Sequence, residues 1–247
     1  MENNNRKNSP RFNKEPFVEV LPKSGIDIKM QYPLLGMKWS ESRCFVRKSV
    51  YERLLKAQSL LPEGYTLRIW DAWRPFKLQE ELYYVYRKQI IEQFHLENAS
   101  EEEQRAIITE YIALPNPDRT YLPTHTTGGA VDVTLLDAQG QELDMGTEFD
   151  SISPKAYAAY YEEDALEKNE AAVAEPVKVE QIRKNRRILR RAMLEAGFTG
   201  IASEWWHFNY GDRLWSDKTG KPAIYAGVYE ISEMEICNEC QKIRDKL

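Results

Sequence analysis

Residues 123–135 read Pro-Thr-His-Thr-Thr-Gly-Gly-Ala-Val-Asp-Val-Thr-Leu. The second half of this segment alternates and is rich in β-branched residues, so it predicts a strand. Asp132 then lies on one face of that strand, and the valines beside it point to the other face. A carboxylate in a strand is costly to bury without a partner, and a metal ion is one partner that makes it tolerable. Because the Gly-Gly pair can adopt positive φ, the chain can fold back and bring His125 near Asp132.

A second segment, residues 203–210, reads Ser-Glu-Trp-Trp-His-Phe-Asn-Tyr. His207 can supply another imidazole, and two histidines with one carboxylate are the ligand set of a catalytic zinc site. Glu204, three residues earlier, has the chemistry of a general base. In a regular strand Glu204 and His207 would face opposite sides. We therefore expect an extended segment with a local irregularity at the two tryptophans, or with Glu204 placed before the strand begins.

Each of these residues also has a simpler interpretation. His125 could be an ordinary loop histidine, and His207 a hydrogen-bonded core histidine. Asp132 could cap a turn or pair with an arginine. The third histidine, His95, ends a polar helix and is expected at the surface. The metal site is favoured because a Gly-Gly turn, a carboxylate in a strand and a Glu-x-x-His segment occur together in one chain.

Composition limits the classes of function. The chain has 247 residues, a net charge of −5 and 42% hydrophobic residues, as in a globular protein that binds no nucleic acid. No run approaches the ~18 apolar residues of a membrane span, and the start does not resemble a secretory signal. We expect a cytoplasmic protein, or a periplasmic one if the start has been trimmed. The three cysteines (Cys44, Cys237 and Cys240) are too few for a disulfide framework, and reduced thiols are favoured over a redox or metal role.

The order of elements indicates one domain. Residues 1–16 are expected to be a disordered tail and residues 17–247 a single domain. Residues 151–181 are expected to be a helical insertion or a cover over the site, with an insertion favoured. Strands are expected over 17–21, 26–30, 65–73 and 130–135, and helices over 49–61, 76–96, 100–114, 179–196 and 231–247. Ser49 is the expected N-cap of the first helix, and the basic runs of the 179–196 helix are expected to face solvent.

Arg74 lies where the strand 65–73 meets the helix that starts at Phe76. Pro75 fits the first position of that helix, and the residue before a proline tends to be extended. Such an elbow is a rigid place from which to aim a guanidinium. The alternative is a structural salt bridge between Arg74 and Asp71.

Four ordered motifs resemble the zinc-dependent D-alanyl-D-alanine dipeptidases of the vancomycin-resistance type. This family belongs to a larger group with zinc D-Ala-D-Ala carboxypeptidases and the metal-binding domain of hedgehog proteins. Spacing and order agree from about Tyr65 to Tyr210. The matching residues are Trp70, Asp71, Arg74 and Pro75; His125, Gly128, Ala130 and Asp132; Met145, Gly146, Phe149 and Asp150; and Glu204 and His207. The third motif separates the dipeptidases from their carboxypeptidase relatives.

The resemblance implies an α+β fold with a small, mainly antiparallel sheet flanked by helices and with zinc in a cleft on the sheet. It implies hydrolysis of D-Ala-D-Ala, or a related small dipeptide, with one Zn²⁺ per chain. The implied ligands are His125, Asp132 and His207. Glu204 is implied as the general base and Arg74 as the group that stabilises the oxyanion. Asp150 is implied as the partner of the substrate's free amine.

The sequence departs from the family at Pro123, where a serine is thought to contact the substrate. Thr124 or Thr126 could take over that contact. Two alternatives remain: a D,D- or L,D-carboxypeptidase that acts on cell-wall peptides, and a zinc-containing binding module without activity. Asp150 argues against the first, and the presence of both Glu204 and Arg74 argues against the second. Whether the chain forms a homo-oligomer is not decided by these motifs.

Overall fold

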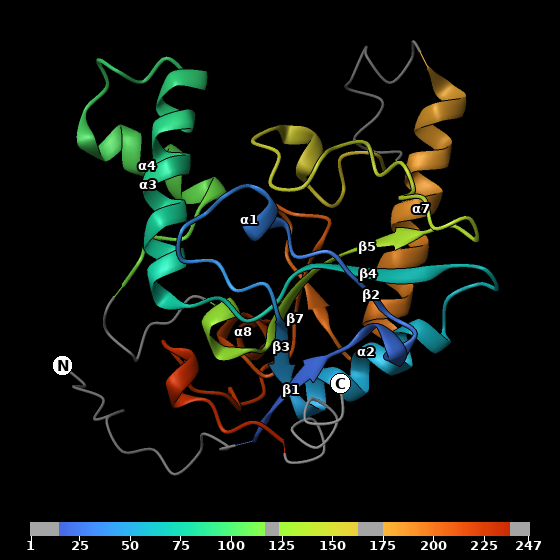
Figure 1. The fold of residues 1–247 in the computed structure, drawn as a ribbon. Coiled ribbons are helices and arrows are strands. Elements are labelled where there is room, and N and C mark those ends of the chain that lie inside the picture. The colour runs from blue at the N-terminus through green and yellow to red at the C-terminus, as the bar shows by residue number, and fades with distance from the viewer. Residues whose placement is uncertain (1–14, 117–123, 163–174, 238–247) are drawn as a thin grey trace.

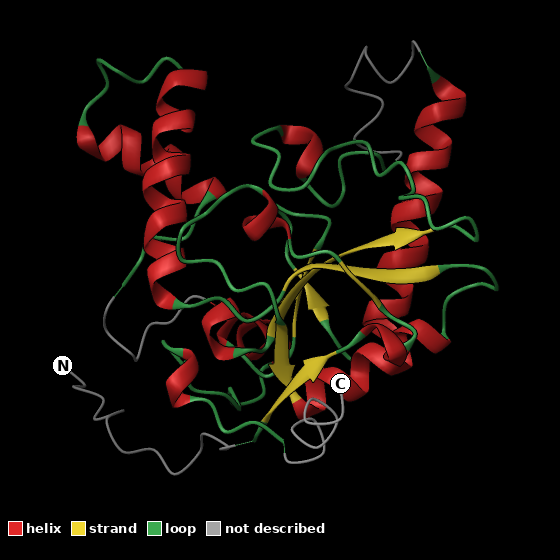
Figure 2. Cartoon of the chain, in the orientation of Figure 1, coloured by secondary structure: helices red, strands yellow, loops and turns green. Residues whose placement is uncertain are grey.

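The computed structural model describes residues 15–116, 124–162 and 175–237 (Figures 1 and 2). Its strands are β1 (Phe17–Val20), β2 (Asp27–Ile28), β3 (Cys44–Arg47), β4 (Thr66–Asp71), β5 (Ala130–Leu136), β6 (Thr199–Gly200) and β7 (His207–Asn209). Its α-helices are α1 (Gln31–Leu34), α2 (Lys48–Ser59), α3 (Phe76–Gln93), α4 (Glu101–Tyr111), α7 (Pro176–Glu195) and α8 (Arg213–Thr219). Short 3₁₀ turns cover Pro22–Ser24, Thr124–Thr127, Pro154–Ala156 and Ile231–Glu233.

The central sheet has five strands in the order β2-β4-β5-β7-β6. Only the short β2–β4 pair is parallel, and the other neighbours are antiparallel. A separate antiparallel pair joins β1 to β3. The expectation of an α+β fold with a small, mainly antiparallel sheet is therefore confirmed.

The core lies between the sheet and the helices α2 and α7, which stand together beside the strands in Figure 1. Alternate residues of β5 point into it, as the pattern predicts. The contributors are Val131, Val133 and Leu135 from β5, Val50 and Leu54 from α2, and Leu189 and Met193 from α7. This packing leaves the other face of β5, with Asp132, for the site. The α3–α4 hairpin stands on the opposite side of the view.

The strand register brings three polar residues side by side on that face. Asp132 of β5 pairs with His207 of β7, and Asp71 of β4 pairs with Asp132. Asp71 reaches this position because the register between β4 and β5 shifts between Ile69 and Asp71. Without that bulge, Asp71 would share the core-facing side of Ile69, which pairs with Val133. The irregularity therefore adds a carboxylate to the site.

Several helix ends differ from expectation. Helix α2 is capped by Arg47 rather than Ser49, whose hydroxyl and backbone N–H donate to the Glu15 carboxylate. Pro75 is the N-cap of α3 and not its first helical residue. Helix α4 begins with a capping box at Ser100, and α7 ends before Gly197, whose φ is +100°.

The C-terminal part differs more. Helix α8 follows β7, and Asp212 caps it by accepting a hydrogen bond from the Trp215 N–H. Instead of a helix from 231, the described residues form one 3₁₀ turn and then pair Ile236 with Phe17. Residues 238–247 lie outside the described part.

Other expectations fall partly or wholly outside the described residues. Of the predicted tail only residues 15 and 16 are described, and of the segment 151–181 only 151–162 and 175–181. Helix α7 begins at Pro176, earlier than the expected start at residue 179. Cys44 is buried, and Cys44 and Cys237 are both free thiols, whereas Cys240 is not described. In the described part of the chain, no helix is both long and apolar enough to cross a membrane.

Candidate metal centre

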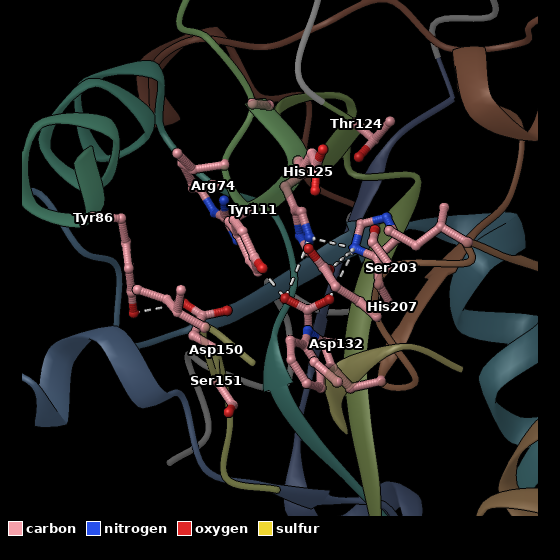
Figure 3. Close-up of a pocket in the computed structure, with 18 of the residues that line it drawn as sticks. Arg74, Tyr86, Tyr111, Thr124, His125, Asp132, Asp150, Ser151, Ser203 and His207 are labelled. Carbon is pink, nitrogen blue, oxygen red and sulfur yellow. Dashed lines mark hydrogen bonds and ion pairs between the residues drawn. The ribbon is translucent and has the colours of Figure 1, made fainter. Parts of the chain in front are cut away.

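Three residues predicted as metal ligands meet on the sheet, although β5 and β7 are far apart in sequence (Figure 3). His125 comes from the 3₁₀ turn before β5, Asp132 from β5 and His207 from the first position of β7. His125 Nε2 lies 3.1 Å from His207 Nδ1 and 3.4 Å from Asp132 Oδ2. His207 Nδ1 lies 3.0 Å from Asp132 Oδ1. All three side chains are buried.

The outer nitrogen of each imidazole is held by an oxygen atom. His125 Nδ1 donates to the carbonyl of Ala72 at 2.7 Å, and His207 Nε2 donates to Asn209 Oδ1 at 2.9 Å. In the neutral rings, the lone pairs of His125 Nε2 and His207 Nδ1 therefore face one another and the Asp132 carboxylate. Outer contacts of this kind fix the tautomer and orientation of metal-binding histidines.

This arrangement fits a small divalent cation. Ligand atoms about 2.0–2.1 Å from a tetrahedral ion are about 3.3–3.4 Å apart, close to the separations found here. Three acceptors that face one another also need a cation or a proton between them. Burial lowers the pKa of His207, but Asp132 outweighs this and raises that pKa to about 9. A proton held this firmly is one that a bound metal would release. Two imidazoles and one carboxylate suit zinc better than calcium or magnesium.

Glu204 stands beside the triad. It precedes β7, so it reaches the site by the second of the two routes predicted, and its Oε2 lies 3.7 Å from His207 Nδ1. Its side chain keeps about a quarter of its surface exposed. Burial raises the pKa of Glu204 to about 7, an effect that His207 opposes and Asp132 reinforces. Such a carboxyl can both take and return a proton near neutral pH.

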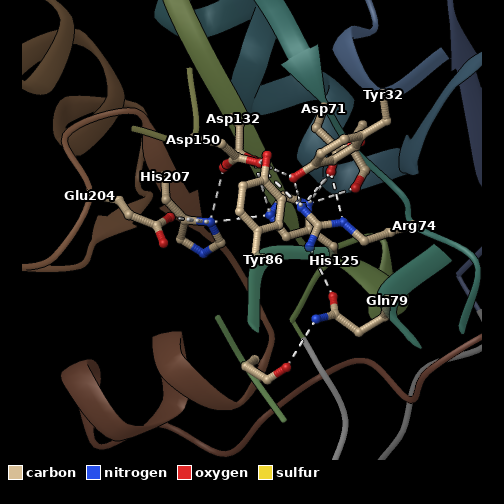
Figure 4. Close-up of polar contacts among 12 residues, drawn as sticks. Tyr32, Asp71, Arg74, Gln79, Tyr86, His125, Asp132, Asp150, Glu204 and His207 are labelled. Atoms are coloured by element: carbon tan, nitrogen blue, oxygen red, sulfur yellow. Dashed lines mark hydrogen bonds and ion pairs between the residues drawn. The ribbon is translucent and has the colours of Figure 1, made fainter. Parts of the chain in front are cut away.

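Arg74 lies at the strand-to-helix elbow, within the network of Figure 4. Its Nε and Nη2 donate to Asp71 Oδ2 at 3.0 and 2.8 Å, so the predicted salt bridge exists. Its Nη1 donates to Gln79 Oε1 at 2.8 Å and its Nη2 to the Tyr32 hydroxyl at 3.2 Å. The salt bridge and a role in the pocket are compatible, because Arg74 also lines the cavity and its Nη2 lies 3.7 Å from Asp132 Oδ2.

Asp150 forms another part of the pocket wall. Its Oδ2 accepts hydrogen bonds from the hydroxyls of Tyr32, at 2.6 Å, and Tyr86, at 2.9 Å. Its φ is +54°, a left-handed conformation that few residues other than glycine adopt. Burial, with Asp132 nearby, raises the pKa of Asp150 to about 6.

These groups share one cavity of about 140 Å³. Thr124 lines it, but Thr126 is fully buried and is not among the lining residues, so a substrate contact by Thr126 in this pocket is not supported. Pro123 lies outside the described residues. Other lining residues are not predicted by the sequence patterns: Tyr32, Gln79, Tyr86, Tyr111 and Ser203. Only Ser203 carried a signal, because it adjoins Glu204.

Comparisons with known proteins show which family the chain belongs to. A protein called D-alanyl-D-alanine dipeptidase from Synechocystis is 32% identical over 179 residues, which are 69% of this chain and 71% of that protein. Proteins of the same name from Escherichia coli and Enterococcus faecium are 29% and 31% identical over 171 and 169 residues. These matches cover 69% and 64% of this chain, and 68% of each relative.

One solved structure that matches is the vancomycin resistance D,D-pentapeptidase VanY, a mutant in complex with Zn(II). The match covers 78% of this chain and 82% of the VanY chain. It has 12% identity and a TM-score of 0.37, which is too low to bear on the fold. The model of peptidase family M15, described as D-ala-D-ala dipeptidase, matches residues 34–223, well over half of the chain. The predicted resemblance is confirmed: this chain belongs to the D-Ala-D-Ala dipeptidase family.

Proposed function

We propose that this chain is a zinc-dependent dipeptidase that hydrolyses D-Ala-D-Ala, or a closely related small dipeptide, to free amino acids. The observation that carries the proposal is the content of a single small cavity. It contains a His-Asp-His triad, a carboxyl with a pKa of about 7, a buried arginine and a second carboxylate. At about 140 Å³ it is smaller than the ~300–1,000 Å³ of most ligand pockets, which favours a small substrate.

His125, Asp132 and His207 would hold the zinc ion. When bound there, zinc acts as a Lewis acid and lowers the pKa of a coordinated water toward about 7. Asp132 contributes the negative charge of the ligand set. Burial raises the pKa of Asp132, but the two imidazoles outweigh it and hold that pKa well below its usual range. Asp132 is therefore ionised across the neutral range.

Glu204 is the proposed proton carrier. It takes a proton from the attacking water as the new C–O bond forms, and it gives that proton to the leaving amine as the C–N bond breaks. The pKa of about 7 suits both transfers, because the carboxyl is partly ionised at neutral pH. Arg74 supplies fixed positive charge for the oxyanion that develops on the carbonyl oxygen. Removing one such donor typically costs about 10²–10³ in rate.

Asp150 is the proposed partner of the substrate's ammonium group. The two tyrosine hydroxyls occupy its Oδ2, and among the described residues Oδ1 accepts no hydrogen bond. A carboxylate placed for an ammonium would be left unpaired by a substrate with a blocked amine. This feature favours a dipeptidase over a carboxypeptidase, whose substrates carry a blocked amine at that position.

The proposed site also bears on how many chains are needed and on where the protein is located. Every group assigned above belongs to one chain, so the proposed chemistry needs no second copy. A cytoplasmic location stays a prediction, which fractionation of the source cells tests.

The test is amine release from D-Ala-D-Ala by the zinc-loaded protein, with N-acetyl-D-Ala-D-Ala and L-Ala-L-Ala measured in parallel. We expect cleavage of the free D,D-dipeptide and none of the acetylated compound. Efficient cleavage of the acetylated compound would assign the chain to the carboxypeptidases instead. Failure to cleave any of the three would contradict the proposed substrate.

A further inference from the structure

We propose that Arg186 is a positioning residue for Asp150. It holds both ends of the loop that carries Asp150, and so determines how well the pocket recognises the free amine of a substrate. The inference rests on the proposed function, which gives Asp150 that amine. Arg186 is not among the residues that line the catalytic cavity, so it acts through the loop and not on the substrate.

The contacts of Arg186 are specific. It projects from α7 with only 5% of its surface exposed. Its Nε donates to the carbonyl of Met145 at 2.7 Å, before Asp150 in the chain. Its Nη2 and Nη1 donate to the carbonyls of Lys155, at 2.8 Å, and Tyr157, at 3.0 Å, after Asp150. One planar guanidinium thus ties the start of the loop 145–157 to its end.

The positive charge of Arg186 is buried without a carboxylate partner among the described residues. Its donors all go to backbone carbonyls. Burial lowers the pKa of Arg186 to about 10, against the opposing effects of Tyr161 and Asp144. A buried charge is costly unless its hydrogen bonds are satisfied. An arginine in this position, rather than an apolar side chain, indicates that the geometry of the loop matters. Arg186 therefore departs from the expectation that the basic runs of α7 face solvent, whereas Lys184, Arg187, Arg190 and Arg191 are exposed as expected.

The loop needs such support at Asp150. The φ of +54° at Asp150 costs free energy in a residue with a side chain, and contacts around the loop offset that cost. Figure 3 shows Asp150 and Ser151 along one wall of the pocket. Further side chains hold the same loop. Asn185 Nδ2 donates to the carbonyl of Asp144 at 2.8 Å, just before the loop, Gln93 Nε2 to that of Ile152 at 2.6 Å, and the Tyr161 hydroxyl to that of Gly146 at 3.3 Å. Arg186 makes three of these backbone contacts and is therefore the residue to change first.

The experiment is a double-mutant cycle on kcat/KM for D-Ala-D-Ala, with the wild type, Arg186→Lys, Asp150→Asn and the double variant. Asp150→Asn should lose about ten- to a hundredfold, as for a hydrogen bond to a charged group. Arg186→Lys keeps the charge but not the planar fork, and should lose about tenfold, mainly through a higher KM. If Arg186 acts through Asp150, the double variant should be no worse than Asp150→Asn alone.

Arg187→Lys is the matched control, because Arg187 is on the same helix but pairs with Glu162 at the surface. It should leave kcat/KM unchanged. Three results would overturn the role of Arg186 and leave the proposed function intact. They are multiplied losses in the double variant, a loss confined to kcat, and full activity of Arg186→Lys. Full activity of Asp150→Asn would overturn the amine assignment in the proposed function, and this inference with it.

Arg186→Lys could fail to fold, so a milder variant completes the design. Asn185→Leu removes one hydrogen bond to the same loop, and its cycle with Asp150→Asn should show the same non-additivity with a smaller loss. Zinc content and unfolding temperature are measured for every variant, so that loss of fold is separated from loss of recognition. Independent, multiplied losses in this second cycle would equally overturn the inference.

Discussion

Asp71 lies directly opposite Asp132 in the pairing of β4 with β5, on the face of the sheet that carries the histidines. Two carboxylates in register would repel each other. Arg74 relieves this repulsion, because its Nη2 is 2.8 Å from Asp71 Oδ2 and 3.7 Å from Asp132 Oδ2. Burial raises the pKa of Asp71, and Arg74 and His125 oppose that rise. Asp71 therefore acts as the carboxylate that aims Arg74, while Asp132 faces the imidazoles.

We expect Asp71→Asn to lower kcat by at least about tenfold with zinc still bound. The amide keeps the volume of Asp71 but carries no negative charge, so it holds Nε and Nη2 of Arg74 more weakly than the carboxylate does. A misaimed arginine stabilises the oxyanion less. Steady-state kinetics and metal analysis of the purified variant check this. Loss of zinc together with activity would instead indicate that Asp71 acts on His125, whose Nδ1 is 3.3 Å away.

Glu204→Ala is expected to keep zinc and to lose about 10²–10⁴ in kcat, the usual contribution of a general acid–base group. The three residues that would hold zinc are untouched, so metal content should stay near one ion per chain. Glu195→Gln, at a surface pair with Arg191, is the control and should be fully active. A zinc-bound Glu204→Ala protein with wild-type turnover would contradict the role of Glu204. If neither it nor the wild type turned over any dipeptide, the binding-module alternative would be favoured.

The sequence alone was sufficient to predict the parts of the site that follow from local pattern. Each of these patterns lies within a short run of the chain: the alternation around Asp132, the Gly-Gly turn and the Glu-x-x-His spacing. The structure has the predicted strand as β5, and Glu204 precedes β7, which is one of the two predicted arrangements. The family and the type of sheet were confirmed as well. The roles of Glu204, Arg74 and Asp150 stay predictions until variants are measured.

What could not be predicted depends on distant pairing. Tyr32 and Tyr86 meet at Asp150 across separations of 118 and 64 residues, and no local pattern marks either tyrosine. The bulge that turns Asp71 toward the site depends on how β4 pairs with β5, and neither strand reveals this alone. From the sequence, Arg186 belongs to a basic run that is expected at the surface. Its burial is not predictable from that run, because the carbonyls that accept its hydrogen bonds come from another segment.

Gln79→Leu should lower kcat by about tenfold and reduce the free energy of unfolding by about 1–3 kcal/mol, because it leaves buried polar groups unpaired. Gln79 is almost fully buried, and it links Arg74 Nη1 at 2.8 Å to the carbonyl of Ala113 at 3.2 Å. Gln79→Glu keeps the acceptor for Arg74 and should recover part of kcat. Kinetics and denaturant unfolding of both variants check this. Equal kcat for Gln79→Leu and the wild type would show that Arg74 needs no such support.

Asp150→Asn should stabilise the metal-free protein at neutral pH while it weakens substrate binding. The folded-state pKa of about 6 lies above the usual 3.8, so the protonated carboxyl favours the fold below about pH 4. This contribution is lost as the pH rises through about 6. The advantage of the variant should therefore grow between about pH 4 and 6 and then stay level, at about 1–3 kcal/mol. Asparagine also tolerates the positive φ. Urea unfolding across this range is the measurement, and a pH-independent difference would contradict the shifted pKa.

Loss of the hydrogen bond between Asn209 Oδ1 and His207 Nε2 should lower the affinity for zinc more than it lowers kcat. Asn209 is fully buried, and its oxygen keeps the Nε2 proton in place so that Nδ1 offers a lone pair toward Asp132 and His125. Loss of such an outer contact typically costs about 10–100-fold in metal affinity. Asn209→Leu should weaken zinc binding by that factor, measured by competition with a chromophoric chelator, and should regain most of its kcat at saturating zinc. His95→Asn is the control, because His95 is exposed at φ of +54° and asparagine tolerates that conformation. Unchanged zinc affinity in Asn209→Leu would mean that the Ala72 carbonyl and Asp132 suffice to orient the two imidazoles.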